Sequence, residues 1–324
     1  MKFAIMATGW IAEKMALTVA QLPQAERYAV ASRSLQKAQE FAKKYGFEKA
    51  YGSYEELVQD RQVELIYVAT PHSHHYECAK LCLEHGKPAL VEKAFCVNAN
   101  QARELIRLSE EKKVFLAEAF WTRYMPVRAM IEDLLQKDII GEVTSVVASF
   151  GLALEDRERL VKPQLAGGAL LDLGVYPMNF ALMYVPSKVK ELTSTAVLSK
   201  EGVDLTNSVT LTFENDCLAQ LHSNMSSLTR NEGILYGKKG YIEVINTNNP
   251  EAVTVYDGEG KVVQRLEIPK QFNGYEYEIL ACMEALEQGR IECEQMPHSE
   301  TLRMMELLDK ARQQWGLEYP CEGI

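Results

Sequence analysis

The sequence predicts an α/β domain with a parallel sheet, followed by an α+β domain with a mostly antiparallel sheet. The chain has 324 residues, which corresponds to two domains at about 100–200 residues each. Strand and helix patterns alternate over residues 1–120, as in βαβ units. After about residue 140, strand patterns follow one another and are joined by short turn sequences, as in hairpins. We therefore divide the chain into residues 1–120 and 121–324.

The elements of the first domain have local start and stop signals. Gly46 and Gly86 follow two helical patterns, at the position where helices commonly end in a left-handed residue. Ser53 and Glu56 have the spacing of a capping box, which indicates a further short helix. We expect strands at residues 2–7, 28–31, 65–69, 89–92 and 114–117, and helices at residues 11–22, 35–45, 73–85 and 100–113.

The second domain combines apolar strands with a few helices. Turn sequences at residues 214–216, 237–240 and 257–260 separate neighbouring strand patterns, which favours antiparallel pairing. The expected helices cover about residues 168–184, 274–288 and 299–315. The expected strands cover residues 143–152, 189–198, 208–213, 217–223, 233–236, 241–244, 252–256 and 262–267.

The composition is that of a globular protein with an acidic balance. Hydrophobic residues make up 47% and charged residues 25% of the chain, which argues against a wholly disordered or fibrous protein. The 35 basic and 45 acidic residues give a formal charge of −10. Because a nucleic-acid-binding protein needs a basic face, we expect no nucleic-acid partner. A small anion held by a few local cations is compatible with this charge.

The apolar run at the N-terminus is short. It is interrupted at Thr8-Gly9, and Glu13 and Lys14 follow. A signal peptide has a longer apolar region, and a membrane helix needs about 18–20 apolar residues in succession. We therefore expect a cytoplasmic protein that has no membrane partner.

The cysteines and histidines lack the spacing of a disulfide framework or a metal site. Seven scattered cysteines are typical of a reducing compartment. Without a CxxC pair of the kind that structural zinc sites use, we expect buried helix cysteines and no metal. The densest group of potential ligands comprises His72, His74, His75, Cys78 and Cys82.

The first expected strand ends in a turn that matches most of a dinucleotide-binding fingerprint. The turn comprises Ala7, Thr8, Gly9, Trp10, Ile11 and Ala12. In the pattern G-x-G-x-x-G/A, Ala7 replaces the first glycine, and Gly9 stands where the backbone approaches a pyrophosphate. The pyrophosphate would lie at the N-terminus of the next helix, whose free N–H groups favour anions. Alternatively, a tight turn without a ligand would also need a small residue here.

The end of the second expected strand favours NADP over NAD. An NAD enzyme usually has Asp or Glu there, bonded to the ribose 2′-hydroxyl. Here Ser32 lies 23 residues after Gly9 (32 − 9), Arg33 follows, and Lys37 lies one helical turn later. A hydroxyl, a guanidinium and an ammonium group suit a 2′-phosphate. Alternatively, these residues form a solvent-exposed helix start, and Arg33 and Lys37 are ordinary surface cations that bind no phosphate.

Several further motifs follow the dinucleotide turn. They are residues 70–75, residues 86–94 and the stretch 166–177, which reads AGGALLDLGVYP. With them the chain resembles the glucose–fructose oxidoreductase/inositol dehydrogenase/MocA family, and residues 118–126 favour its dimeric dihydrodiol dehydrogenase and NADP-dependent D-xylose dehydrogenase branch. The resemblance implies an N-terminal Rossmann domain and a C-terminal domain with a large open, mostly antiparallel sheet. It also implies a homodimer or higher homo-oligomer formed through that sheet.

The resemblance implies the site residues as well. Glu92-Lys93-Ala94 matches the family's Glu-Lys-Pro, so Lys93 would be the catalytic lysine. Asp172 and Tyr176 would be the acidic and the proton-transferring residues. Further cofactor-binding residues would be Thr70, Pro71 and His75, in the loop over the nicotinamide, together with Glu92, Lys93, Trp121 and Arg123.

These residues suit hydride transfer. An alcohol that loses a hydride also loses a proton from oxygen, and a tyrosine with a pKa near ~10 is a weak base at neutral pH. A nearby ammonium group favours the phenolate, so Lys93 would tune Tyr176 and polarise a carbonyl in the reverse direction. Asp172 would fix the lysine or orient a substrate hydroxyl. We therefore expect an NADP-dependent oxidoreductase that acts on a sugar or small cyclic diol. The alternatives are that Lys93 is an ordinary surface cation, that Tyr176 only packs against its neighbours and that Asp172 is an acid at the start of a helix.

Two positions depart from the family pattern. Ala7 replaces a glycine, which would cost about 1 kcal/mol if the position requires a positive φ. Ala94 replaces a proline, and because cis bonds before other residues are rare, we expect a trans Lys93-Ala94 bond. This second departure keeps an alternative function open, namely a catalytically impaired regulatory or interaction protein that senses NADP.

Overall fold

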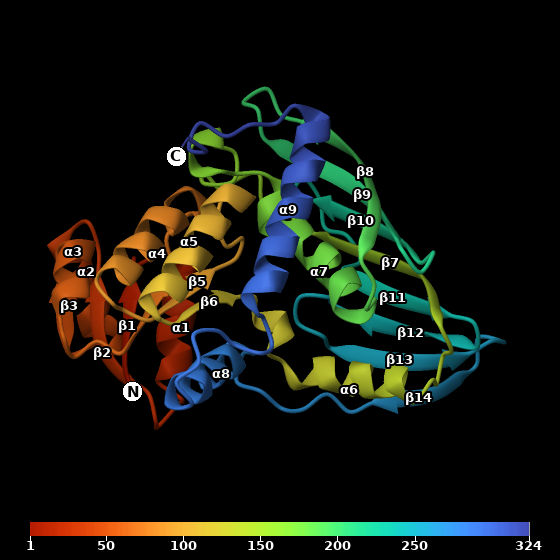
Figure 1. The fold of residues 1–324 in the computed structure, drawn as a ribbon, viewed down its shortest axis with the longest axis horizontal. Coiled ribbons are helices and arrows are strands. Elements are labelled where there is room, and N and C mark those ends of the chain that lie inside the picture. Colours follow the sequence, from red (N-terminus) through yellow and green to blue (C-terminus); the bar gives the residue numbers. More distant parts are fainter. Residues whose placement is uncertain (324) are drawn as a thin grey trace. The chain divides into compact units, whose positions relative to one another are not determined.

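The computed structural model describes residues 1–323, and the chain folds into two units (Figure 1). The first comprises Met1–Tyr124 and Gln271–Met305, and the second comprises Met125–Lys270 and Glu306–Gly323. Residues 271–305 lie in the second domain of the sequence-based division, but in the structure they cluster with the first unit. The Leu116 N–H donates to the Ile291 carbonyl at 2.9 Å, and this bond joins the segment to strand β6.

The first unit contains a six-stranded sheet in the order β3-β2-β1-β4-β5-β6. All neighbouring strands are parallel, as expected. Strands β4, β5 and β6 are buried throughout, as in parallel sheets covered on both faces. The strands are β1 (Lys2–Met6), β2 (Glu26–Ala31), β3 (Lys49–Tyr51), β4 (Leu65–Val68), β5 (Ala89–Glu92) and β6 (Leu116–Ala119).

The helices of the first unit follow the expected pattern. Ser53 caps α3 by accepting the Glu56 N–H at 3.1 Å, which confirms the capping signal. A last helix, α9 (His298–Trp315), begins in this unit and ends in the second. The other helical elements are α1 (Trp10–Val19), α2 (Leu35–Tyr45), α3 (Tyr54–Gln59), η1 (His72–His74), α4 (His75–Glu84), α5 (Ala99–Lys112), η2 (Trp121–Arg123) and α8 (Glu276–Glu287).

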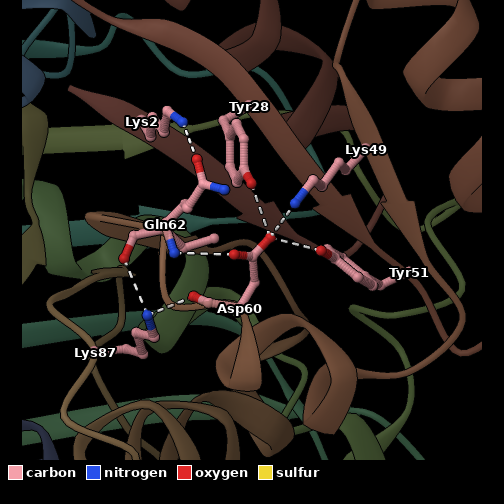
Figure 2. A network of polar contacts seen from close by, with 8 residues as sticks. Lys2, Tyr28, Lys49, Tyr51, Asp60, Gln62 and Lys87 are labelled. Carbon is pink, nitrogen blue, oxygen red and sulfur yellow. Dashed lines mark hydrogen bonds and ion pairs between the residues drawn. The ribbon is translucent and has the colours of Figure 1, made fainter.

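A polar cluster around Asp60, just after α3, holds the edge strand β3 (Figure 2). The Asp60 Oδ2 atom accepts from Lys49 Nζ at 2.8 Å, from the Tyr51 hydroxyl at 2.6 Å and from the Tyr28 hydroxyl at 3.0 Å. Its Oδ1 atom accepts the Gln62 N–H at 2.9 Å. Burial raises the pKa of Asp60, but these hydrogen bonds outweigh burial and hold that pKa below its usual range.

The second unit contains an eight-stranded sheet in the order β14-β13-β12-β11-β7-β10-β9-β8. It is mostly antiparallel, as expected, and β7 and β10 form its parallel pair. The strands are β7 (Val143–Gly151), β8 (Val189–Leu198), β9 (Asp204–Phe213), β10 (Leu218–Asn224), β11 (Glu232–Gly237), β12 (Gly240–Ile245), β13 (Ala252–Asp257) and β14 (Val262–Leu266).

The central helix of the second unit is α7 (Val175–Tyr184), which contacts β7, β10 and β11. It continues a short π-helix, η4 (Leu170–Gly174), so the helix expected at 168–184 has two parts. Among the described residues, the stretch Pro163–Tyr184 is long and apolar enough to cross a membrane by length and composition alone. Its most apolar window has a mean hydropathy of 1.2, and 94% of that window is buried inside the structure. This burial is that of a core helix. The remaining helical elements are α6 (Pro126–Gln136) and η3 (Pro163–Leu165).

Candidate functional site

The cofactor-binding residues expected in the first unit follow the carboxyl ends of its strands. They lie in the segments after β1, β2, β4 and β6 and at the end of β5. Since the strands are parallel, these ends meet at one edge of the sheet. The chain changes direction across the sheet between β1 and β4, and ligands of open α/β sheets bind at such a switch point.

The turn after β1 presents an open helix N-terminus. Gly9 is the N-cap of α1 and makes no side-chain cap, so the first N–H groups lack the partner that a capping side chain would supply. Gly9 has a φ of −80°, and apart from its neighbours along the chain no protein atom lies within 4 Å of the place that a Cβ would take. Neither conformation nor packing therefore requires glycine here. A ligand that approaches the backbone would require it, and the turn fits a pyrophosphate.

Ala7 occupies a conformation that favours glycine. Its φ is +91°, so the alanine costs about 1 kcal/mol relative to an unstrained residue. The Ala7 N–H donates to the Ala31 carbonyl at 2.9 Å, which fixes the turn against the end of β2. Trp10 is 67% exposed at the start of α1, and Thr8 and Ile11 are half-buried beside it in the sequence.

The end of β2 presents two cations to solvent. Arg33 and Lys37 are exposed, and neither has an ion-pair partner among residues 1–323. Ser32 is buried, and its hydroxyl accepts the Ser34 N–H at 3.4 Å. The Ser34 hydroxyl in turn caps α2 by accepting the Lys37 N–H at 3.4 Å. Unpaired cations at this edge suit an external anion such as a 2′-phosphate.

The loop after β4 is anchored by His75. This buried ring lies 2.8 Å from the Ala94 carbonyl through Nδ1 and 2.8 Å from the Thr70 carbonyl through Nε2. Burial lowers the pKa of His75 to about 4, so the ring is neutral at pH 7 and has one N–H to donate. The ring therefore donates to one of these two carbonyls and lies between the loop of Thr70 and Pro71 and the segment that carries Lys93.

The Lys93-Ala94 bond is cis, so our expectation of a trans bond is wrong. The peptide bond before Ala94 thus has the isomer that bonds before proline adopt more readily. Lys93 itself is half-buried. Glu92, at the end of β5, is buried; it accepts the Tyr67 hydroxyl through Oε1 and the Lys93 N–H through Oε2, the latter at 3.1 Å. Glu92 therefore holds the backbone from which Lys93 projects.

Trp121 and Arg123 make contacts within the first unit. The Trp121 ring stacks on Tyr275, with 4.3 Å between centroids and 12° between planes. Arg123 is buried, and its Nη2 atom pairs with Glu300 at 2.9 Å. Both residues thus fasten residues 271–305 to η2. Their expected contact with a cofactor stays a prediction.

Asp172 and Tyr176 lie in the second unit, whereas Lys93 lies in the first. Asp172 is on the π-helix η4, and Tyr176 follows at the start of α7. The Asp172 carboxylate, 8% exposed, pairs with Arg159 Nη2 at 3.0 Å. The Tyr176 ring lies 5.0 Å from the Phe150 ring. The expected contact of Asp172 with the lysine or a substrate hydroxyl stays a prediction, and Arg159 is its observed partner.

Sequence reasoning missed several polar residues near these positions. Arg159 lies in a segment without a recognisable motif, and Tyr67 is hidden in an apolar strand pattern. Glu118 and Glu278 carry a signal that could have been used, namely an acid within an apolar strand or helix face. Both are buried, and burial raises the pKa of Glu118 to about 7 and that of Glu278 well above its usual range.

The histidines and cysteines after β4 do not form a set of metal ligands in the structure. Among residues 1–323, no three His, Cys, Asp or Glu side chains lie close enough together to hold a metal ion. Cys78 and Cys82 are free thiols buried in α4.

The sequence matches two family models in succession. The model for the oxidoreductase family with an NAD-binding Rossmann fold (GFO/IDH/MocA) matches residues 1–120, and the GFO/IDH/MocA C-terminal domain matches residues 129–243. Together these matches cover more than half of the chain.

Curated relatives match over almost their whole length. A trans-1,2-dihydrobenzene-1,2-diol dehydrogenase from Xenopus laevis is 35% identical over 98% of this chain and 99% of the relative. The Homo sapiens protein of the same name is 32% identical over 99% of this chain and 98% of its own. A D-xylose 1-dehydrogenase (NADP(+)) from Hypocrea jecorina is 35% identical over 99% of this chain and 93% of its own.

Solved structures share the fold. A 3-ketoreductase from Actinomadura kijaniata, solved with NADP and TDP-benzene, has a TM-score of 0.89 at 24% identity, with 97% of each chain covered. The family models, the curated relatives and the two sheets agree, and the chain belongs to the glucose–fructose oxidoreductase/inositol dehydrogenase/MocA family of oxidoreductases.

Proposed function

We propose that the protein is an NADP-dependent oxidoreductase that transfers a hydride between nicotinamide and a hydroxyl or carbonyl carbon of a sugar or small cyclic diol. The names of its relatives support this activity, because they are a diol dehydrogenase and an NADP-dependent xylose dehydrogenase at 35% identity. One observation carries the assignment to this chain: an uncapped helix N-terminus at Gly9, with the unpaired cations Arg33 and Lys37 at the end of the neighbouring strand.

The binding roles follow from charge and geometry. The N–H groups at the start of α1 would hold the pyrophosphate, and the missing side chain of Gly9 leaves room for it. Arg33, Lys37 and Ser32 would hold the 2′-phosphate, since β2 is the strand whose end meets the adenosine ribose in this fold. An acid at this point would instead repel the phosphate and favour NAD.

The catalytic roles are assigned to Lys93, Asp172 and Tyr176. When bound, the nicotinamide supplies the hydride chemistry. Tyr176 takes the proton from the substrate hydroxyl during oxidation and returns it during reduction. Lys93 is the cation that stabilises negative charge on the reacting oxygen. Asp172, held by Arg159, orients a substrate hydroxyl.

A cofactor and substrate screen tests this function. The purified protein is mixed with NADP⁺ or NAD⁺ and with trans-1,2-dihydrobenzene-1,2-diol, D-xylose or other aldoses, and reduced cofactor is measured. We expect turnover with NADP⁺ and a loss of kcat of about 10²–10⁴-fold in Tyr176→Phe and in Lys93→Met. Tyr45→Phe, in a half-buried residue at the end of α2, is the control and should leave kcat unchanged. NADPH binding without turnover of any compound would favour the impaired regulatory protein instead.

We also propose that copies of the chain associate through the eight-stranded sheet. Exposed apolar side chains on its strands support this: Val197, Leu198, Leu218, Tyr236, Val262 and Val263. Sedimentation equilibrium should give a dimer or higher oligomer that Val197→Glu and Val263→Glu weaken, and a monomeric wild type would contradict the proposal.

A cytoplasmic location and the lack of nucleic-acid and membrane partners stay predictions, which cell fractionation and binding assays can test.

A further inference from the structure

We infer that Asp204 and Tyr319 are positioning residues that hold Asp172 and Tyr176 in place through the turn at Gly167 and Gly168. The inference rests on the proposed function, because it concerns the residues to which catalysis is assigned there. All of these residues belong to the second unit, so the contacts described below lie within it.

Asp204 fastens the first residue of the π-helix. It is fully buried at the start of β9. Its Oδ2 atom accepts the Leu170 N–H at 2.8 Å and the Asn207 Nδ2–H at 2.8 Å. Leu170 begins η4, and Asp172 lies two residues later. The carboxyl group of a residue in a sheet strand thus fixes the start of the helix that carries Asp172.

The glycine pair before Leu170 fits closely against this carboxyl group. Gly168 has a φ of +118°, and a Cβ there would lie 2.2 Å from Asp204 Oδ1. A Cβ on Gly167 would lie 2.4 Å from the Leu160 carbonyl oxygen. The two glycines therefore allow the turn to enter a space that any side chain would fill. This gives the Gly-Gly of the AGGALLD motif a physical reason that needs no ligand.

Tyr319 fastens the same turn from the C-terminal segment. Its buried hydroxyl donates to the Gly167 carbonyl at 2.7 Å. Arg312, from α9, lies over the Tyr319 ring at 4.9 Å and pairs with Asp309 at 2.8 Å and with Glu322. The Glu322 carboxylate also accepts the Tyr319 N–H at 2.7 Å. Tyr319 is thus held rigidly and can restrain the turn.

The effect on catalysis follows from distance along the chain. Leu170 and Tyr176 are separated by less than two helical turns, with Asp172 between them. A turn that is free to shift would move both catalytic side chains together. Displacements near 1 Å at reacting groups reduce rates by up to about 10²-fold. Because these contacts lie in the second unit, cofactor binding by the first should change little.

Tyr319→Phe tests the inference, with Tyr28→Phe as its matched control. Each change removes one hydroxyl from a buried tyrosine that donates one hydrogen bond, to Gly167 in the first case and to Asp60 in the second. We expect Tyr319→Phe to lower kcat by about 5- to 20-fold, with KM for NADP unchanged within about twofold. Tyr28→Phe should lose about as much thermal stability as Tyr319→Phe does, but it should leave kcat unchanged. Equal kcat in Tyr319→Phe and wild type would overturn the inference, and so would equal losses in both variants.

A second pair of variants gives a readout that needs no activity. Asp204→Asn keeps an oxygen that can accept the Leu170 N–H, whereas Asp204→Ala removes it. Amide hydrogen exchange of residues 168–176 should be at least about tenfold faster in Asp204→Ala and in Tyr319→Phe and near wild type in Asp204→Asn, with exchange in β1 and β4 unchanged. If the wild type turns over no compound, the proposed function fails, and this exchange pattern still decides the inference. Unchanged exchange in both Asp204→Ala and Tyr319→Phe would refute it.

Discussion

Asp60→Asn should lower the free energy of unfolding of the first unit by about 2 kcal/mol at pH 7. In the least costly orientation, the amide oxygen replaces Oδ2 and continues to accept from Lys49, Tyr51 and Tyr28, but without its charge. Weaker acceptance at these three contacts, observed at 2.6–3.0 Å, costs about 1 kcal/mol in all. The amide nitrogen then faces the Gln62 N–H, whose lost hydrogen bond costs about 1 kcal/mol more.

Thermal and urea unfolding measure this loss. For a unit of this size, about 2 kcal/mol corresponds to a fall in Tm of about 4–8 °C. Asp156→Asn is the control, because its side chain is 76% exposed and surface changes usually stay within about 0.5 kcal/mol.

The pH dependence has a definite sign. The pKa of Asp60 is lowered in the folded state, so its contribution is present above the unfolded pKa of about 3.9 and is lost as pH falls below it. The difference between Asp60→Asn and wild type should therefore shrink below about pH 4. A difference under about 0.5 kcal/mol at pH 7, or one that grows as pH falls, would refute the reasoning.

Three further predictions concern the cofactor turn and the catalytic residues. Ala7→Gly should raise the free energy of unfolding by about 0.5–1 kcal/mol, because Ala7 has a φ of +91°; a destabilised variant in urea unfolding would contradict this. Arg33→Ala should raise the Kd for NADP⁺ by about tenfold or more and that for NAD⁺ by less than about twofold, measured by calorimetry; equal effects on both would place the 2′-phosphate elsewhere. Arg159→Ala should lower kcat or raise the substrate KM by about tenfold without changing the Kd for NADP⁺, because it removes the ion pair between Arg159 and the Asp172 carboxylate; unchanged kinetics would show that this pair is dispensable.

The fold was predictable wherever its signals are local. Strand and helix alternation, the Ser53 cap and the turn sequences of the second half each lie within a short window, and the structure confirms the two sheets that they indicate. The three-residue strand β3 carries too short a pattern to be recognised, and the Asp60 cluster that holds it joins residues far apart in the sequence. Residues 271–305 cluster with the first unit through contacts of the same long-range kind, since the Leu116 N–H meets the Ile291 carbonyl 175 residues later in the sequence (291 − 116).

The candidate site was predictable to a different degree in each part. The turn at Gly9 and the cations after β2 follow from spacing alone, and the structure leaves both accessible. The cis isomer at Ala94 was not predictable, because a trans bond is the rule before residues other than proline. Arg159 and Asp204 could not be found either, because their partners Asp172 and Leu170 are distant in sequence and no motif marks them.

Transfer of deuterium from a labelled substrate to NADP⁺ tests the central claim most directly. D-xylose carrying deuterium at the reacting carbon, or the corresponding labelled diol, is incubated with the protein and NADP⁺, and the reduced cofactor is analysed by mass spectrometry. We predict singly deuterated NADPH with the wild type and none with Tyr176→Phe on the same timescale. Bound NADPH that never acquires deuterium from any sugar or diol tested would contradict the assignment of this chain as an NADP-dependent dehydrogenase.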